Sequence, residues 1–190
     1  APIAKRWERF LTMLDDYRER WRMKGIRSSM SEYNVKHEVV PNFGDLKMML
    51  SCIRPDVEIR YTTDGSEPHE YSMLYRRPLI IKQSQTVKCA TFKDGKRLGQ
   101  ILAIPVHVSG VTGRNVLRST SVERRLVNGV RGSLKNTDDE WTFWKKNDSI
   151  AVTIDVGVRK RLGKVSLGYL NHFGLGIHKP QKVEVWLSDN

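Results

Sequence analysis

A stripe of apolar side chains at helical spacing runs through the start of the chain. Its members are Trp7, Phe10, Leu11, Leu14, Tyr17 and Trp21. They recur at i, i+3, i+4 and i+7, which places them on one face of a helix from Pro2 to Lys24. Gly25 is a natural stop for this helix. A stripe this aromatic normally packs on a large surface, so the helix either packs on the following domain or has lost a partner.

After a connector of mixed character, the period of the apolar positions changes from helical to two. Alternating runs occupy Leu46–Cys52, Val57–Tyr61, Leu79–Ile81, Val87–Phe92 and Leu102–Val108. Turn residues separate them at 54–56, 64–66 and 93–96. Short strands at this spacing predict a small β-sandwich, which we place at residues 41–109.

A second β region is predicted at residues 110–190. The polar, glycine-containing stretch Ser109–Asn115 indicates an interdomain linker. Beyond an irregular segment, alternation returns in the runs Ala151–Val156, Val165–Tyr169 and Val183–Leu187. The expected fold class is therefore mainly β, with an N-terminal amphipathic helix followed by two small β-sandwiches.

The turn Asp64-Gly65-Ser66 with Pro68 raises the choice between a ligand site and a structural corner. Glycine tolerates positive φ, the aspartate can accept hydrogen bonds from downstream amides, and the proline prevents the strand from resuming at once. A calcium loop needs more oxygen ligands than this stretch supplies. We expect a structural turn.

The chain is strongly basic, with a formal net charge of +12 over 190 residues. The basic residues are spread along the whole length without a block, so a solvated basic surface is favoured over a nucleic-acid site. No apolar run is long enough for a membrane span, and the charged start APIAKRWERF is unlike a signal peptide. We expect neither nucleic acid nor a membrane as partner.

Metal and cofactor chemistry is not expected. Cys52 and Cys89 lack CxxC spacing, and both fall in strand-like runs where cysteine serves as a small apolar residue. The five histidines show no ligand spacing, and no glycine-rich phosphate loop is present.

Three stretches resemble known modules. The run EIRYTTDGSEPHEYSMLYRRPLIIKQSQTVKCATFKDGKRLGQ resembles the Ig-like sandwich that follows the barrel in bacterial chitobiases and β-N-acetylhexosaminidases. The preceding RWERFLTMLDDYRERWRMKGIRSSMSEYNV resembles the last helix of the catalytic barrel of family 20 glycoside hydrolases and the strand that enters the sandwich. LVNGVRGS, IDVG and KPQKVEVWLSD are similar to a discoidin-like (coagulation factor type C) domain of the galactose-binding, jelly-roll fold. Their order matches Bacteroides-type β-hexosaminidases.

The resemblance implies a barrel-exit helix with its connector at 1–40, a chitobiase-type sandwich at 41–109 and a discoidin-like domain at 110–190. The family pattern continues beyond Asn190, so we expect an incomplete second domain and favour a fragment over completion by another segment. The implied role is non-catalytic: the chain braces the upstream catalytic barrel of the same polypeptide and holds glycans near it. The family also implies a periplasmic or extracellular location. The alternative is a stand-alone glycan- or protein-binding module.

No catalytic residues are expected in this chain, although its parent is expected to be a glycosidase. Family 20 enzymes use an adjacent Asp-Glu pair in the barrel, which protonates the leaving group and orients the substrate's acetamido group. Here Asp15-Asp16 lies on the polar side of a predicted helix, and Asp138-Asp139-Glu140 lies in a predicted loop. Both groups are expected to be solvated charges, so the chain alone should hydrolyse nothing.

The aromatic cluster Trp141, Phe143 and Trp144 is the leading candidate for carbohydrate binding. Aromatic faces suit sugar rings, and discoidin-like domains often bind glycans through loops at one end of the sandwich. The competing interpretation is that one tryptophan anchors the irregular segment in the core while the other covers the domain interface. Asn171 and His172, in the run NHFGLGIH, form a second candidate rim, which could equally be a glycine-shaped turn.

Overall fold

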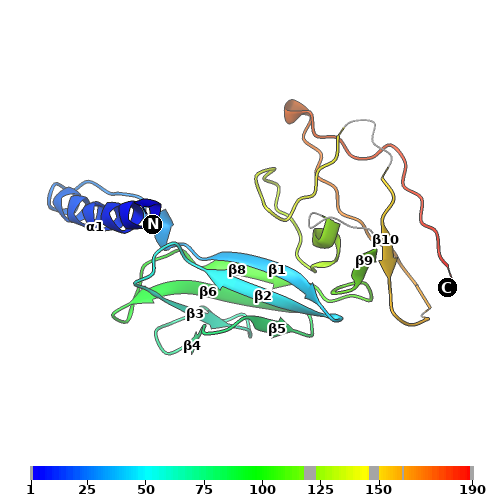
Figure 1. Ribbon diagram of the computed structural model, residues 1–190, viewed down its shortest axis with the longest axis horizontal. Helices are drawn as coiled ribbons and strands as arrows, with labels where there is room; N and C mark the ends of the chain where they lie inside the picture. The colour runs from blue at the N-terminus through cyan, green and yellow to red at the C-terminus, as the bar shows by residue number, and fades with distance from the viewer. Residues whose placement is uncertain (1, 118–122, 146–149, 160, 189–190) are drawn as a thin grey trace.

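The computed structural model describes residues 2–117, 123–145, 150–159 and 161–188, and it confirms the mainly β class. Figure 1 shows one helix at one end, a layered pair of sheets in the middle and a loosely built C-terminal part at the other end. No helix in these ranges is both long and apolar enough to cross a bilayer.

The first sheet of the sandwich contains β1 (Lys36–Asn42), β2 (Asp45–Ser51) and β5 (Leu79–Ile81), all antiparallel in the order β1-β2-β5. A two-residue loop joins β1 to β2, since Asn42 pairs with Asp45. Both loop residues have positive φ, 51° at Phe43 and 94° at Gly44, which is the geometry of a type I′ hairpin.

The second sheet contains β3 (Glu58–Thr62), β4 (Met73–Leu74), β6 (Gln85–Lys93), β7 (Lys96–Arg97) and β8 (Leu102–Val106). Strand β6 is its centre: it pairs with β3 along one edge and with β8 and β7 along the other. The β6–β7 turn again has positive φ at both residues, 50° at Asp94 and 73° at Gly95. The predicted runs at 46–52, 57–61, 79–81, 87–92 and 102–108 thus correspond to β2, β3, β5, β6 and β8.

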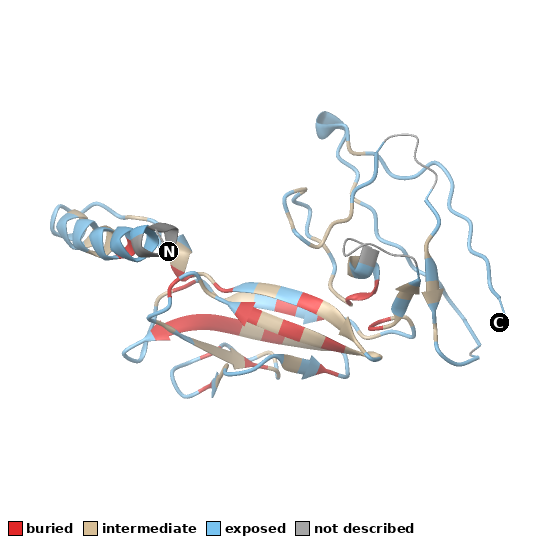
Figure 2. Cartoon of the chain, viewed as in Figure 1, coloured by how far each residue is buried: buried red, intermediate tan, exposed pale blue. Residues whose placement is uncertain are grey.

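The hydrophobic core lies between these two sheets. Its buried members are Val35, Val39, Leu46, Met48, Leu50, Ile81, Val87, Cys89, Ile104 and Val106. Burial of each large aliphatic side chain contributes about 1.5–3 kcal/mol. Figure 2 shows that buried residues concentrate in the sandwich, whereas the C-terminal part is largely exposed. The sandwich is therefore the stable unit to which the other parts attach.

Helix α1 (Pro2–Met23) agrees with the predicted helix to within one residue at its end. Gly25, at φ 71°, ends it, and the amide of Ile26 donates to the carbonyl of Trp21 at 2.8 Å. This pairing around a left-handed glycine is typical of helix C-caps. A short 3₁₀ turn, η1 (Ser31–Tyr33), then leads into β1.

Strand β1 lies inside the connector where the sequence pattern predicted no strand. Of its seven residues only Val39 is fully buried, and Pro41 cannot donate to the ladder. Proline is tolerated because β1 is an edge strand that pairs with β2 alone in its sheet. The weak alternation and the proline together explain why the pattern missed it.

The C-terminal part forms one small sheet, β9 (Asn115–Leu117) with β10 (Thr153–Asp155), and the 3₁₀ turns η2 (Glu123–Val127) and η3 (Phe173–Leu175). The run Ala151–Val156 contains β10. The strands predicted at Val165–Tyr169 and Val183–Leu187 are wrong, since neither segment pairs with a neighbour in the described ranges. Their apolar side chains are exposed instead. Alternation alone does not make a strand, because the ladder needs a partner.

The predicted linker packs against the sandwich. The amide of Gly44 donates to the carbonyl of Gly113 at 3.2 Å, and the amide of Gly113 donates to Val127 at 2.8 Å. A Cβ at Gly113 would lie 2.3 Å from the carbonyl oxygen of Asp45. Thr112 is buried in the same contact. The segment after residue 109 therefore packs against the β1–β2 hairpin and is not a free linker.

Candidate functional site

A charged cluster fixes helix α1 to one end of the sandwich. Arg54, whose side chain is only 3% exposed, donates to both oxygens of Asp15 at 3.2 and 2.7 Å. The same guanidinium donates to both oxygens of Asp56 at 2.9 Å. It also lies over the ring of Tyr33, 4.8 Å from the centroid. We call Asp15, Arg54, Asp56 and Tyr33 the helix clasp.

Electrostatics hold the clasp in its charged form. Hydrogen bonding to Arg54 lowers the pKa of Asp56 to about 2, with a further contribution from Lys93, whose Nζ lies 2.7 Å away. Burial alone would lower the pKa of Arg54, but its hydrogen bonds with Asp56 and Asp15 raise it overall. A buried guanidinium needs this pairing, since an unpaired charge in the interior is strongly destabilising.

A second contact reinforces the clasp. Arg18 forms an ion pair with Glu32 of η1, and its Nη2 donates to the carbonyl of Ser29 at 2.5 Å. Leu11, one turn before Asp15, is also buried. Leu11, Asp15 and Arg18 recur at i, i+4 and i+7, so one edge of α1 faces the sandwich.

Outside these contacts α1 carries exposed aromatic and apolar side chains. Trp7 is 39% exposed, Phe10 50%, Met13 46% and Tyr17 46%. Trp7 stacks on Phe10 with ring centroids 5.3 Å apart. Successive helical residues differ by about 100°, so Phe10 points well away from the docked Leu11. We call Trp7, Phe10, Met13 and Tyr17 the α1 stripe, which matches the predicted stripe in part.

The predicted stripe thus contains buried, half-buried and exposed members. Leu11 is buried, Leu14 and Trp21 are half-buried, and Trp7, Phe10 and Tyr17 are exposed. A four-residue apolar patch on a rigid helix can pack against a flat protein surface.

The turn Asp64-Gly65-Ser66 is arranged as a structural corner. Oδ1 of Asp64 accepts hydrogen bonds from the amide of Ser66 at 3.0 Å and from its hydroxyl at 2.6 Å, which lower the pKa of Asp64. Thr62 closes the corner by donating to the carbonyl of Ser66 at 2.6 Å. Gly65 has a φ of 84°, and Pro68 is buried behind the turn. β4 begins only at Met73, so a longer loop and not a tight hairpin joins it to β3.

The aromatic loop divides between an anchor and an exposed pair. The indole nitrogen of Trp141 donates to the carbonyl of Ser133 at 2.7 Å, and Arg125 donates to the carbonyl of Trp141 at 2.9 Å. A Cβ at Gly132 would lie 2.4 Å from the Trp141 ring, so this ring packs directly on the glycine backbone. Phe143 and Trp144 remain 51% and 41% exposed. Trp141 is thus the anchored member of the cluster, and Phe143 and Trp144 are its exposed members.

Asn171 and His172 lie in a separate, exposed turn. The amide of His172 donates to the carbonyl of Ile177 at 2.9 Å, and the amide of Ile177 donates back at 3.1 Å. This bridge closes the η3 turn, whose Gly176 has a φ of 67°. Within the described ranges no hydrogen bond or ring contact joins either residue to the aromatic loop. The two predicted rims are not assembled into one site.

The acidic groups are engaged in structural contacts. Asp138 accepts hydrogen bonds from the amides of Ser133 at 2.7 Å and Glu140 at 2.9 Å. Burial would raise its pKa, but these backbone hydrogen bonds lower it overall. Asn128 donates to Glu140 at 2.5 Å, and Nε2 of His37 lies 3.2 Å from the same carboxylate. Glu140 thus ties the aromatic loop to β1.

Sequence reasoning missed both the clasp and the His37–Glu140 contact. From sequence, the run Arg54-Pro55-Asp56 predicts only a turn, and the one hint of more is a pair of opposite charges beside a proline. The partner Asp15 is 39 positions away in sequence, so no local pattern links the two. Across the parts of the chain that the structure describes, no group of three or more potential metal ligands occurs.

The comparison with protein families identifies part of the sandwich. Residues 48–105 match the family described as Fn3 associated. The matched segment begins within β2 and ends within β8, so it covers most of the two-sheet core. No curated protein matches the chain. This part of the chain is similar to fibronectin-III-like associated domains, and the chain carries an accessory β-sandwich module.

Proposed function

We propose that the chain is the non-catalytic accessory region of a β-N-acetylhexosaminidase, a glycoside hydrolase that releases terminal N-acetylhexosamine. In this proposal the α1 stripe packs against the upstream catalytic barrel, and the clasp transmits that contact to the sandwich. The parent acts on glycans outside the cytoplasm, in the periplasm or at the cell surface. The resemblance of three consecutive segments and the Fn3-associated match support the assignment.

The observation that carries the proposal is that α1 is docked along one edge yet keeps four large apolar side chains exposed. One edge is fixed to the sandwich by a buried arginine that makes four hydrogen bonds to two carboxylates. Outside that contact the helix presents Trp7, Phe10, Met13 and Tyr17. A helix that only covered its own sandwich would turn its aromatic side chains inward, because that burial stabilises the fold. A helix that bridges two domains needs a docked edge and a second apolar surface for the other domain.

A hydrolysis assay tests the enzymatic part. The product of the whole gene should cleave 4-nitrophenyl N-acetyl-β-D-glucosaminide, whereas the 190-residue chain should release no product. Cleavage needs a proton donor and a stabilising group held in a rigid site, and here Asp138 and Glu140 are occupied by structural contacts. Turnover by the chain alone that disappears in the variant Asp138→Asn/Asp139→Asn/Glu140→Gln would contradict the proposal. So would an inactive whole-gene product.

Paired variants test the bracing role. In the whole-gene product, Trp7→Ser/Phe10→Ser should leave the initial rate unchanged but shorten the lifetime of activity on heating. The control Glu8→Ser/Thr12→Ser changes two exposed residues of the same helix outside the stripe. Equal lifetimes for the two double variants would indicate that the stripe contacts nothing, which favours the stand-alone module.

Glycan contact is the second part of the proposal, and we assign it to Phe143 and Trp144. Both are exposed beside the anchored Trp141, and flat aromatic faces suit sugar rings. Phe143→Ala/Trp144→Ala should abolish retention of the whole-gene product on immobilised chitin oligosaccharide. Tyr71→Ala, which removes an 83% exposed aromatic ring from the sandwich, is the control. Retention that survives the double variant would move the site, first to Asn171 and His172.

A further inference from the structure

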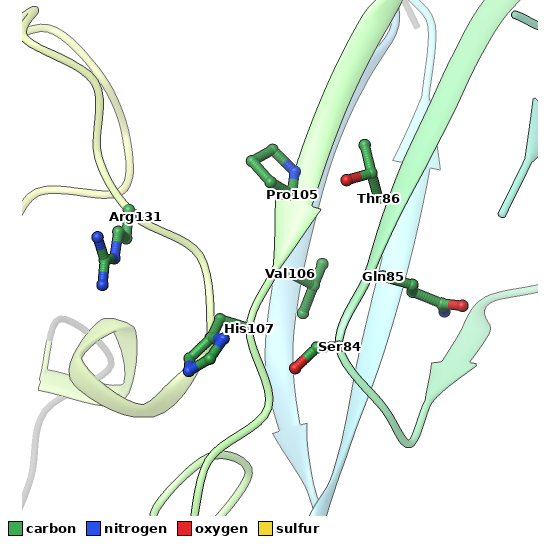
Figure 3. Close-up of a pocket in the computed structure, with 8 residues that line it drawn as sticks. Ser84, Gln85, Thr86, Pro105, Val106, His107 and Arg131 are labelled. Atoms are coloured by element: carbon green, nitrogen blue, oxygen red, sulfur yellow. The ribbon is translucent and has the colours of Figure 1, made fainter. Parts of the chain in front are cut away.

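A cavity of about 510 Å³ lies where β8 leaves the sandwich and the C-terminal part begins. Its lining comes from the start of β6, the end of β8 and the segment after η2: Ser84, Gln85, Thr86, Pro105, Val106, His107, Gly129 and Arg131. Figure 3 shows Arg131 and His107 on one side of the space and Pro105 and Thr86 on the other. Pockets of 300–1,000 Å³ are the usual size for small-molecule ligands.

The backbone fixes the walls of this cavity. Val106 and Val130 form a β-bridge, and the amide of His107 donates to the carbonyl of Gly129 at 2.8 Å. Gly129 has a φ of 73°, and a Cβ there would lie 2.7 Å from the carbonyl oxygen of His107. The segment that carries Arg131 is thus held close against the end of β8. The site is preformed on ordered backbone, which lowers the entropic cost of binding.

Strand register places the lining side chains. Thr86 pairs with Pro105, so the two lie side by side on one face of the sheet. His107 follows Pro105 by two residues and continues that outward face, whereas Val106 points into the core. The outward face therefore offers a hydroxyl group, a flat pyrrolidine ring and an imidazole in sequence.

The charge of the cavity is positive. None of the eight lining residues is acidic. In the described portion of the chain, no carboxylate pairs with the guanidinium of Arg131, which is exposed. An unpaired guanidinium presents donors in a planar fork that matches a carboxylate or sulfate. The preferred ligand therefore carries an anionic group.

We propose that this cavity binds an acidic saccharide unit, a sugar ring that carries a carboxylate or a sulfate. Arg131 binds the anionic group, the hydroxyl of Thr86 and the imidazole of His107 bind sugar hydroxyls, and the ring packs on Pro105. The saccharide class rests on the proposed function, while the anionic group rests on the lining alone. The cavity is larger than a bare inorganic anion requires.

Titration of the 190-residue chain, followed by NMR of its backbone amides, tests this site. The probes are glucuronic acid, N-acetylglucosamine 6-sulfate, neutral N-acetylglucosamine and inorganic sulfate. We expect one or both acidic sugars to shift the amide signals of Thr86 and His107 and to bind at least about tenfold more tightly than the neutral sugar, because a hydrogen bond to a charged group is worth more than a neutral one. Which acidic sugar binds distinguishes carboxylate from sulfate.

Two matched variants complete the experiment. Arg131→Gln should weaken binding of the acidic sugar about tenfold or more. Arg97→Gln makes the same change in charge on β7, at the far end of β6, where Arg97 makes only an exposed 3.6 Å contact with Glu67. It should bind normally. Three results would each overturn the proposal. The first is unchanged affinity of Arg131→Gln for the acidic sugar. The others are binding of the neutral sugar or inorganic sulfate as tight as that of the acidic sugar, and no binding of any sugar. Failure of the proposed function would appear separately, as a whole-gene product without N-acetylhexosaminidase activity.

Discussion

Replacement of Asp15 by alanine should release helix α1 from the sandwich. Asp15→Ala removes two hydrogen bonds between charged groups, those from Arg54 at 3.2 and 2.7 Å. Arg54 keeps Asp56, so the guanidinium is not left without a counter-ion. Charged hydrogen bonds contribute about 1.5–3 kcal/mol, but the Asp15 side chain is 43% exposed, and solvent screening reduces the docking energy lost to about 1–2 kcal/mol.

Hydrogen exchange is the suitable assay, because the change is local. Most of the stability of a helix in a protein comes from tertiary packing, so undocking exposes the amides of the 22-residue α1 to exchange. A loss of 1–2 kcal/mol corresponds to about 5- to 30-fold faster exchange in the middle of α1. Amides of β6 in the core should be unaffected.

The neighbouring residue supplies a matched control. Asp16→Ala removes the same charge from the same helix, but Asp16 is exposed and makes no contact with Arg54. Both changes raise helix propensity equally, so propensity cancels in the comparison. Equal exchange rates in α1 for the two variants would refute the conclusion that the clasp holds the helix.

Three further predictions concern the sandwich. The folded-state pKa of Asp56, about 2, lies below its ordinary 3.8, so the stability that ionised Asp56 adds to the fold is present above pH 4 and lost as the pH falls through about 2. Because this carboxylate is 35% exposed, solvent screening reduces the contribution to about 1 kcal/mol. Acid unfolding of the wild type should show this loss, and acid unfolding of Asp56→Asn should not. Gly99→Ala places a Cβ 2.4 Å from the carbonyl oxygen of Tyr33 and should lower the free energy of unfolding in urea by about 1–3 kcal/mol. Gly110→Ala, whose Cβ would meet nothing within 4 Å, should change it by less than about 0.5 kcal/mol. Similar losses for the two variants would contradict the packing assigned to Gly99. Burial raises the pKa of the Cys89 thiol to about 12, so iodoacetamide at pH 8 should label Cys89 only after unfolding. If Cys89 of the folded protein were labelled as fast as the half-buried Cys52, β6 would not be in the core.

The sequence predicted those elements whose side chains face one core. In β2, Leu46, Met48 and Leu50 are buried in strict alternation, so the period-two pattern located the strand directly. The same pattern was misleading at Val183–Leu187, where alternating apolar residues have no neighbouring strand in the described ranges. Alternation indicates that one face of a strand can be buried, whereas strand pairing depends on residues that are distant in sequence.

The candidate site was less accessible to sequence reasoning. The aromatic stripe of α1 followed from helical periodicity, but its division between docked and exposed sides depends on where Arg54 lies. Trp141 and Trp144 share a motif, yet one is anchored by Ser133 and Gly132 and the other is exposed. The cavity at Arg131 unites β6, β8 and a later loop, and no sequence motif joins these three segments.

Hydroxyl-radical footprinting of the α1 stripe tests the central claim most directly. Oxidation of Trp7, Phe10, Met13 and Tyr17 is measured by mass spectrometry in the 190-residue chain and in the whole-gene product. These side chains are 39–50% exposed in the chain, and Tyr71 of the sandwich, at 83%, serves as the internal reference. The account predicts that all four become protected in the whole-gene product, because the catalytic barrel covers them. Oxidation at equal rates in the two proteins would contradict it.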